Sequence, residues 1–190
     1  MEKKKKMTKV LIGESLKGLM LRYPFEKITI KMITAEAGVI RPTFYNYFYD
    51  KYEVLEWIFS EDIIESVMEL FDQEMYSEGL KLLFVRMKRD AQFYTRAFEI
   101  TGQNSFENIL NDYLFRMFMV ELDKAYVPPA LNNPLMTKEL VARYYSISTV
   151  QMLKTWVQGD LQNYSADDMV EAFEYLLKHG LTDYLELYKK

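Results

Sequence analysis

One stretch of this 190-residue chain, residues 29–51, constrains its fold more than any other. The stretch reads TIKMITAEAGVIRPTFYNYFYDK. Thr29 is a good N-cap for a helix that runs to Ala37, and Gly38 suits the left-handed turn that ends such a helix. A second helix begins at Arg41-Pro42, because proline in the first helical turn loses no hydrogen bond. The sequence therefore predicts two short helices joined by a tight glycine turn.

The second of these helices carries more polar side chains than a core helix needs. Thr43, Tyr45, Asn46 and Tyr47 crowd onto its two turns. The phenylalanines between and after them, at positions 44 and 48, are expected to be core residues. This layout is typical of a helix-turn-helix, in which the second helix reads DNA.

Charge is divided unevenly along the chain. Residues 1–51 carry 11 Lys or Arg against 5 Asp or Glu, a net of +6, whereas residues 52–190 carry 13 against 23, a net of −10. The two parts together give the overall charge of −4. A basic head on an acidic body is expected when one part of a protein meets phosphates. The run Lys3–Lys6 is read either as a solvated tail or as an arm that reaches the phosphate backbone.

Helical periodicity covers the rest of the chain, and no strand alternation competes with it. Helices are expected over about 7–23, 50–70, 79–88, 91–100, 105–124, 137–157 and 165–188. Asp50, Thr137 and Ser165 are the expected N-caps of three of them. The predicted fold class is all-α, with a small helix-turn-helix head over residues 1–50 and a larger helical body over residues 51–190.

The composition argues against an enzyme. The chain has no cysteine and a single histidine, His179. A Cys/His pair, a Ser/His/Asp set and a zinc cluster of ordinary composition are therefore excluded. We expect no catalytic residue, no cofactor and no metal site. The lack of cysteine fits a reducing cytoplasm, and no segment approaches the roughly 20 apolar residues of a membrane span.

Motifs over residues 25–51 carry a family resemblance. They are FEKITI (25–30), AEAGV (35–39), TFYNYF (43–48) and the lysine at 51. With them the chain resembles the TetR/AcrR family of transcriptional regulators. The resemblance implies an all-α homodimer whose three N-terminal helices bind a double-stranded DNA operator. It also implies that the C-terminal domain binds a small-molecule effector or a protein co-regulator, and that the last two long helices form the dimer.

The resemblance further implies which residues meet DNA. They are Thr29, Lys31, Arg41, Pro42, Thr43, Tyr45, Asn46, Tyr47 and Lys51. Arg41 is the predicted base reader, because a guanidinium can bond bidentately to guanine. Tyr45 and Tyr47 are expected to bond phosphates through their hydroxyls. Lys51 stands at a helix N-terminus, where amide dipoles favour a phosphate.

The body holds a second, more local resemblance. FYTRAFEITGQNSF (93–106) and WVQG (156–159) are similar to the DhaS-like branch of the family, the dihydroxyacetone kinase regulators. That branch implies control by a kinase-like partner protein rather than by a small ligand. Structure alone also explains the GQNS turn, because Gly102 can end one helix while Asn104 or Ser105 caps the next.

Two further residue sets are predicted for the body. Residues expected to line an effector pocket are Phe93, Tyr94, Phe98, Phe106, Tyr113 and Met117. Residues expected at a dimer interface are Tyr144, Ile147, Trp156, Phe173, Leu177 and Tyr184. Aromatic and methionine side chains at helical spacing are also typical of a plain core, so the pocket and the core remain alternatives.

The resulting hypothesis is a homodimeric regulator that sets two Arg41-bearing helices in successive major grooves, about 34 Å apart, on a near-palindromic site. A membrane-surface protein that uses Lys3–Lys6, and an interaction module that ignores DNA, are the alternatives. The sequence does not give the operator, the effector, the regulated genes or the sign of regulation.

Overall fold

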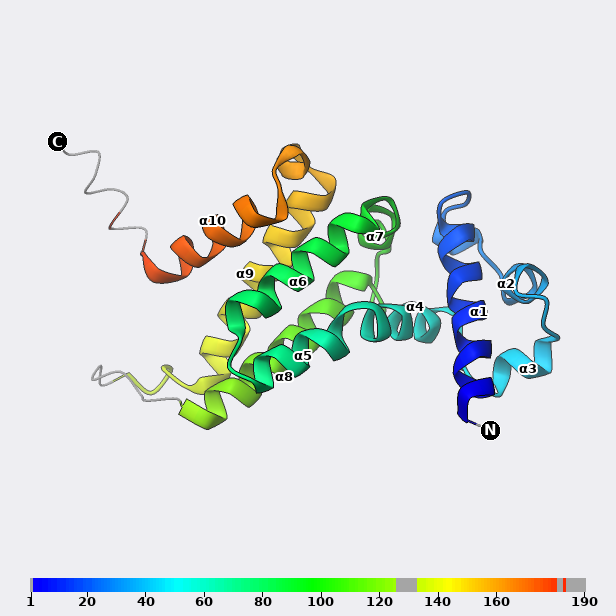
Figure 1. Ribbon diagram of the computed structural model, residues 1–190, viewed down its shortest axis with the longest axis horizontal. Helices are drawn as coiled ribbons and strands as arrows, with labels where there is room; N and C mark the ends of the chain where they lie inside the picture. The colour runs from blue at the N-terminus through cyan, green and yellow to red at the C-terminus, as the bar shows by residue number, and fades with distance from the viewer. Residues whose placement is uncertain (1, 126–132, 181–182, 184–190) are drawn as a thin grey trace.

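A computed structural model gives the fold and describes residues 2–125, 133–180 and 183. Within these ranges the chain is helical and has no strand, so the predicted all-α fold class is confirmed. The helices of the head are α1 (Glu2–Met20), η1 (Phe25–Lys27), α2 (Ile30–Glu36) and α3 (Arg41–Tyr45). Those of the body are α4 (Lys51–Phe59), η2 (Ser60–Ile64), α5 (Glu65–Asp72), α6 (Tyr76–Arg89), α7 (Ala91–Phe98), α8 (Phe106–Ala125), α9 (Lys138–Gln158), η3 (Asp160–Asn163) and α10 (Ala166–Lys178). Head and body lie at opposite ends of an elongated molecule (Figure 1).

The turn between the first two helices of the motif forms as predicted. Thr29 caps α2, since its side chain accepts a hydrogen bond from the Met32 N–H at 3.3 Å. Gly38 has a φ of 66°, the left-handed conformation that glycine adopts without strain. The second helix of the motif, α3, is shorter than two turns, because it ends at Tyr45 and Asn46 is its C-cap.

The first helix differs from its prediction at both ends. It begins at Glu2 rather than near Met7, so the backbone of the lysine run is part of α1. It ends at Met20, and the chain then turns before Pro24. The described side chains of the run, Lys5 and Lys6, are exposed, and Lys6 pairs with Glu61 of η2.

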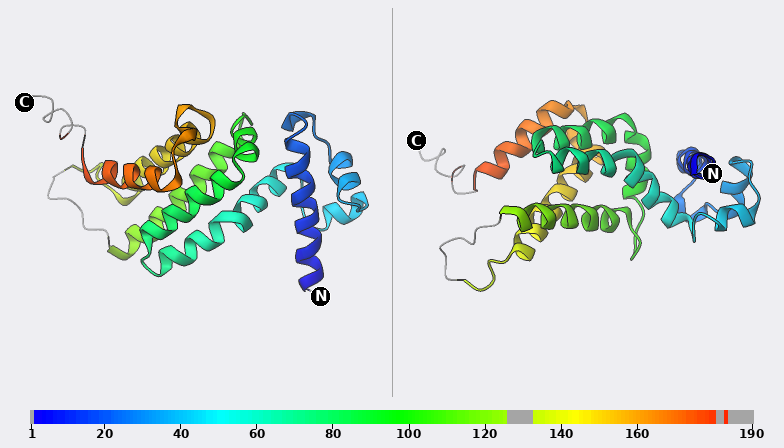
Figure 2. Two further views of the ribbon diagram at one scale, coloured as in Figure 1. Left: turned by 45° about the horizontal axis from the view of Figure 1, so that its top comes forward. Right: turned by 60° about the horizontal axis from the view of Figure 1, so that its bottom comes forward.

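One long helical path joins the head to the body. The segments α4, η2 and α5 follow one another without a break, and Figure 2 shows them as a continuous helix leading away from α1. Asp50 caps α4 by accepting hydrogen bonds from the Tyr52 and Glu53 N–H groups. The middle segment, η2, is a π-helical turn. The boundary expected at residue 50 thus falls at the start of a helix that contacts both parts.

The body packs α5 to α10 around a core of apolar side chains that continues into the head. Two N-caps predicted for the body are confirmed: Thr137 caps α9, and Ser165 forms a capping box with Asp168 at the start of α10. α10 ends at Lys178, with His179 in an extended conformation, so the helix expected over 165–188 is interrupted there. Most of its remaining residues lie outside the described part of the chain. The predicted interface residue Tyr184 lies outside the described residues.

Candidate nucleic-acid interface

The short helix α3 presents a polar face outward because its other face is anchored in the head. Phe44 is fully buried and Phe48 is 2% exposed. Their rings pack 6.0 Å apart between centroids, and the Phe48 ring contacts Trp57 of α4 at 5.8 Å. The predicted core role of both phenylalanines is confirmed. Because both phenylalanines point into the head, the residues between them face outward.

Two of the displayed side chains bond to each other. The Arg41 guanidinium donates to the Tyr45 hydroxyl from Nη2 at 3.0 Å and from Nε at 3.3 Å. The pair is one helical turn apart, the spacing at which side chains share a face. Tyr45 is 48% exposed, and Arg41 is exposed as well. The arginine predicted to read bases is thus held at the tip of the head by a neighbour that was predicted to bind phosphate.

The other residues that were predicted to contact DNA differ in their exposure to solvent. Pro42 and Asn46 are exposed, and Thr43 and Tyr47 are half-buried. Thr29 and Lys31 at the start of α2 are exposed. The hydroxyl oxygen of Thr29 accepts a bond from the α2 backbone, so its proton is still available to a phosphate.

The ammonium of Lys51, which was predicted to meet a phosphate, is bonded to the protein itself. Its Nζ donates to the carbonyl oxygens of Phe25 at 2.6 Å, Ile28 at 3.0 Å and Glu26 at 3.2 Å. These bonds engage all three of its N–H groups. Burial lowers the pKa of Lys51, with Glu26 and Asp50 opposing that shift. We therefore correct the prediction: Lys51 joins the start of α4 to the η1 segment and is occupied by the protein itself.

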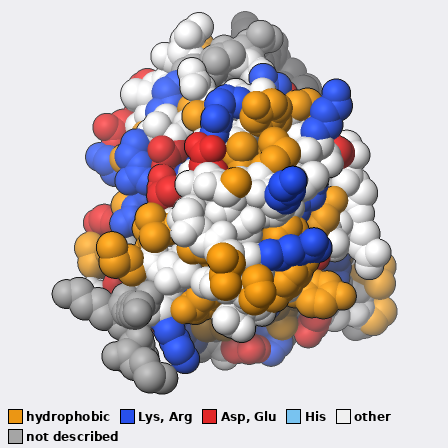
Figure 3. All heavy atoms as spheres, turned by 90° about the vertical axis from the view of Figure 1, so that its right-hand side faces the viewer, with side chains coloured by type: hydrophobic (Ala, Val, Ile, Leu, Met, Phe, Trp, Pro, Cys, Tyr) orange, Lys and Arg blue, Asp and Glu red, His pale blue; other side chains and the backbone are white. Residues whose placement is uncertain are grey.

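Two exposed apolar side chains beside α3 were not predicted. Ile40, the N-cap of α3, is 69% exposed, and Tyr49 is 85% exposed. Their signal in the sequence is weak, because each flanks the polar run instead of belonging to it. Figure 3 shows this end of the molecule, where Lys and Arg side chains lie among apolar ones and acidic side chains gather mainly toward the left and lower edges. Cations and apolar contacts on one face suit a DNA groove.

The residues predicted to line an effector pocket are mostly core. Tyr94 and Phe106 are fully buried, and Phe98 is 5% exposed. Their rings pack together, with Phe106 centroids 5.0 Å from Phe98, 5.6 Å from Tyr94 and 5.3 Å from Phe59. The remaining members are Phe93 at 4% exposure, Met117 at 2%, and the half-buried Tyr113, whose hydroxyl donates to Glu56. Most of these side chains therefore pack against one another and against Phe59 as core residues.

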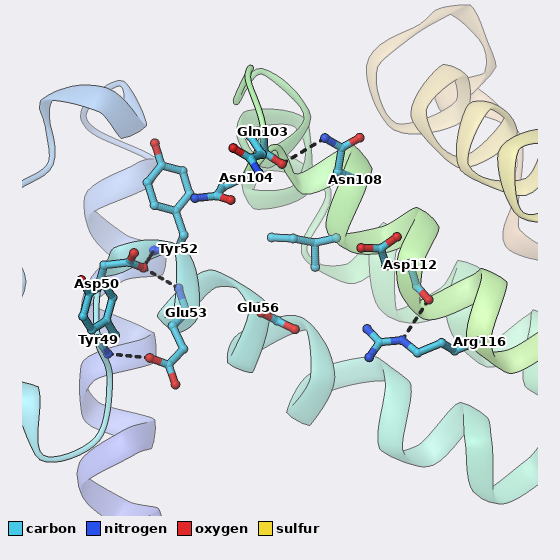
Figure 4. A pocket seen from close by; sticks show the side chains of 11 residues that line it. Tyr49, Asp50, Tyr52, Glu53, Glu56, Gln103, Asn104, Asn108, Asp112 and Arg116 are labelled. Carbon is cyan, nitrogen blue, oxygen red and sulfur yellow. Dashed lines mark hydrogen bonds between the residues drawn. The ribbon is translucent and has the colours of Figure 1, made fainter.

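Open clefts lie elsewhere on the body. A polar cleft of about 330 Å³ separates α4 from α8 and the turn before it, and its walls include Tyr52, Glu56, Asn104 and Arg116 (Figure 4). Exposed Gln103 and Asn104 of the GQNS turn stand at its rim. An almost wholly apolar cleft of about 290 Å³ lies between α5, α6, α8, α9 and α10. Neither cleft is where the pocket was predicted.

The predicted dimer residues divide into exposed and buried sets. Tyr144 and Ile147 on α9 are 66% and 54% exposed, and Leu177 on α10 is 39% exposed. Trp156 and Phe173 are 1% and 3% exposed and pack around Phe84 of α6. These two side chains are core residues, which is a correction to their predicted place on an interface.

The described helices contain no segment that is both long and apolar enough to cross a membrane. Within the same residues, no group of three or more His, Cys, Asp or Glu side chains is arranged to hold a metal ion.

Family models match both parts of the chain. Residues 17–58 match a model for bacterial regulatory proteins of the tetR family, and residues 74–179 match one for a transcriptional regulator C-terminal region.

Curated relatives are also regulators. The chain is 30% identical over 119 residues to DhaS of Lactococcus lactis, an HTH-type dhaKLM operon transcriptional activator. The matched region covers 60% of this chain and 64% of that protein. The chain is also 25% identical over 157 residues to the uncharacterized HTH-type transcriptional regulator YxbF of Bacillus subtilis. That match covers 78% of this chain and 39% of YxbF. The matches therefore span less than two thirds of the length of either relative.

Solved structures share the fold. The dihydroxyacetone kinase operon activator DhaS superposes with a TM-score of 0.65 at 22% identity, over 90% of this chain and 93% of that one. A TetR-family regulator from Syntrophomonas wolfei superposes with a TM-score of 0.69 at 21% identity, over 93% and 97% of the two chains. Since the two family models cover the anchored recognition helix and most of the helical body, this chain belongs to the TetR family of bacterial transcriptional regulators.

Proposed function

We propose that this regulator binds a specific, near-palindromic DNA operator as a homodimer and that a signal received by its body controls the binding. One observation carries the DNA-binding part of the proposal: the exposed Arg41–Tyr45 pair on a helix whose opposite face is locked by Phe44 and Phe48. A rigid support of this kind holds a polar pair at a fixed height above the head. Such a pair can enter a major groove.

The chemistry of the pair suits simultaneous contact with a base and a phosphate. Tyr45 accepts hydrogen bonds through its oxygen, so its own proton remains free for a phosphate oxygen. The Arg41 guanidinium has five N–H donors, and two nitrogens face Tyr45. The remaining N–H groups can bond to O6 and N7 of a guanine, the commonest specific contact of arginine in DNA. Tyr45 would thereby position Arg41 as well as bind the backbone.

An exposed apolar face on the body supports pairing of two copies. Tyr144 and Ile147 of α9 and Leu176 and Leu177 of α10 each expose more than a third of their surface. Contiguous apolar residues at this density mark protein-protein contacts. A symmetric dimer that sets two α3 helices about 34 Å apart, one helical turn of DNA, would require a near-palindromic operator.

The controlling signal is a small ligand or a protein partner. Two observations favour a DhaS-like activator controlled by a partner protein. The chain is similar in sequence to DhaS, an operon activator, and the predicted pocket residues form the packed ring cluster around Phe106. Exposed Gln103 and Asn104 offer a polar surface to such a partner.

Selection from a random pool of duplex DNA at moderate salt tests the proposal. The wild-type chain should enrich a near-palindromic site, whereas Arg41→Ala should lose discrimination at one base pair in each half-site by about 5- to 150-fold. Lys81→Ala, on the body, is the control and should select the same site as wild type. Enrichment of no sequence by the wild-type chain would refute operator binding.

A second measurement separates the two kinds of signal. Cell extract is divided by ultrafiltration, and each fraction is added to the protein–operator complex. A change in operator affinity caused only by the filtrate identifies a small ligand, and a change caused only by the retained macromolecules identifies a protein partner.

A further inference from the structure

Lys17 joins the head to the adjacent end of the body. Lys17 lies on α1, and its side chain is 14% exposed. Its Nζ forms an ion pair with Asp62 of η2 and lies 3.6 Å from Oδ2 of Asp90, the residue between α6 and α7. The ring of Phe93 on α7 lies 5.5 Å from the same ammonium. A single side chain of the head thus contacts two segments of the body, η2 and the start of α7. Lys6 of α1 forms a second, more exposed ion pair with Glu61 of η2.

Asp62 is held from two sides at the irregular point of the connecting helix. It belongs to the π-helical turn η2 between α4 and α5. Its carboxylate pairs with Lys17, and its backbone carbonyl accepts a hydrogen bond from Arg86 of α6. Single π-turns inside α-helices are rare and concentrate at functional positions. The π-turn is therefore the point where the long helix can change its bend, and cations from α1 and α6 bind it there.

The first half of the connecting helix packs against the head. A Cβ atom added at Gly13 of α1 would come within 2.9 Å of the Trp57 ring and 3.2 Å of Ile58, so α1 and α4 are in close contact. Trp57 also contacts Phe48, which anchors α3. The start of α4 is thus packed on the head, whereas its last residue, Phe59, packs against Phe106 and Tyr113 of the body.

Asp90 completes the cluster on the body side. It accepts hydrogen bonds from Arg89 at 2.8 and 3.3 Å, and it faces Lys17. Burial works to raise the pKa of Asp90, but the Arg89 and Lys17 contacts outweigh burial and leave that pKa below its ordinary value. The carboxylate is thus kept charged and available to Lys17. Burial raises the pKa of the nearby Tyr94 hydroxyl, and the charges of Asp62 and Asp90 raise it further. In the described structure this buried hydroxyl has no hydrogen-bond partner.

We infer that Lys17 is a positioning residue that fixes the head on the body through Asp62 and Asp90, beside the π-turn at which the connecting helix can bend. The inference rests on the proposed function, because head position matters to a dimer that must span two half-sites. A signal that moves α6 or α7 would draw Asp90 away from Lys17 and change the spacing of the two recognition helices. Coupling through such a junction is a shift between two arrangements of packed elements.

A distance measurement tests the inference directly. The natural chain has no cysteine, so cysteines introduced at exposed Lys27 of η1 and Glu78 of α6 can carry spin labels without background. Labelled chains are diluted with unlabelled ones, so that only distances within a chain are measured. We expect one narrow head-to-body distance for the otherwise native chain, a broader or displaced distribution for Lys17→Met, and recovery of the narrow distribution for Lys17→Arg.

A matched control breaks an ion pair that lies within the body. Lys81 of α6 pairs with Asp167 of α10 at 2.5 Å, and Lys81→Met should leave the head-to-body distance unchanged. Operator affinity should fall roughly 5-fold in Lys17→Met and stay unchanged in Lys81→Met. Should Lys17→Met fail to fold, Asp90→Asn is measured instead, because it weakens only the longer of the two contacts.

The outcomes are distinguishable. An unaltered distance distribution in folded Lys17→Met, or in Asp90→Asn where that variant replaces it, overturns the positioning role, whatever happens to DNA binding. Absence of any preferred operator for the wild-type chain would instead overturn the proposed function. The spin-label distances still decide in that case whether Lys17 fixes the head.

Discussion

At the scale of single residues, basic side chains that look alike in the sequence have different tasks. Arg41 and Lys51 both stand near helix N-termini in the basic head, yet one is exposed beside Tyr45 and the other donates to three carbonyl oxygens. The carbonyl partners of Lys51 lie 23 to 26 residues earlier in the chain. No local pattern reveals such partners, so the sequence predicted the exposed role for both.

A substitution at Lys51 should therefore affect folding more than DNA contact. Lys51→Met removes three hydrogen bonds and leaves the part-buried carbonyls of Phe25 and Ile28 without their donor. Leaving buried acceptors unpaired costs about 1 to 3 kcal/mol, so we expect a loss of about 2 kcal/mol in the free energy of unfolding, measured in urea. The salt dependence of operator binding should keep its slope. A slope shallower by about one unit with unchanged stability would restore the phosphate role.

At the scale of secondary-structure elements, local signals fixed most helix starts. Thr29, Asp50, Thr137 and Ser165 each accept backbone hydrogen bonds at the N-terminus for which they were proposed. These signals are readable because a cap and its helix are adjacent in sequence. Helix ends were harder: apolar periodicity continues beyond residue 180, but α10 ends at Lys178, before Gly180. Periodicity alone does not show where a chain leaves a helix.

The turn before α3 depends on the backbone of one glycine. Gly38 has a φ of 66°, and a Cβ atom added there would meet no other atom within 4 Å. Gly38→Ala should therefore cost only the strain of the left-handed conformation, about 1 to 2 kcal/mol. Gly18, inside α1, is the matched control, because a Cβ there would lie 3.9 Å from Arg22 at the nearest. Gly18→Ala should raise the melting temperature while Gly38→Ala lowers it; equal signs would contradict this account.

The stability that the capping box gives to α10 should depend on pH. Hydrogen bonds from the Ser165 hydroxyl and backbone N–H lower the pKa of Asp168 below its ordinary value of 3.8. Because the folded-state pKa is the lower one, the capping box contributes stability above about pH 4 and loses it as the pH falls through the folded-state pKa. Asp168→Asn should therefore melt at a lower temperature than wild type at pH 7, and the difference should shrink toward pH 3. A difference independent of pH would show that the carboxylate charge is not involved.

At the scale of the whole molecule, the sequence predicted the architecture but not what fills the body. The apolar stripe through Phe93, Phe98 and Phe106 was compatible with both a pocket and a core. Its rings meet Phe59 of the connecting helix, which enters from a distant part of the chain. A stripe shows that a face is apolar, whereas only the assembled fold shows whether another element covers it. The same reason explains Trp156 and Phe173, which α6 covers.

The exposed apolar stripe on α9 is the surface through which two copies of the chain are expected to pair. Ile147 is 54% exposed at the centre of α9, one turn from Tyr144. In a two-fold dimer that uses this face, a single substitution enters the interface twice, so Ile147→Glu would bring two like charges together in an apolar contact. Association should weaken by about 100-fold, as measured by sedimentation velocity, and operator affinity should fall with it because one head alone makes half of the contacts.

Val85 on α6 provides the control for this substitution. Its side chain is 44% exposed, close to the exposure of Ile147, but it lies outside the α9 stripe. Val85→Glu should leave both association and operator binding unchanged. If Ile147→Glu stays as dimeric as wild type while Val85→Glu dissociates, pairing uses the α6 side of the body. The two recognition helices would then have a different separation from the one that a dimer through α9 and α10 sets, and the spacing of the half-sites selected from the random pool would report it independently.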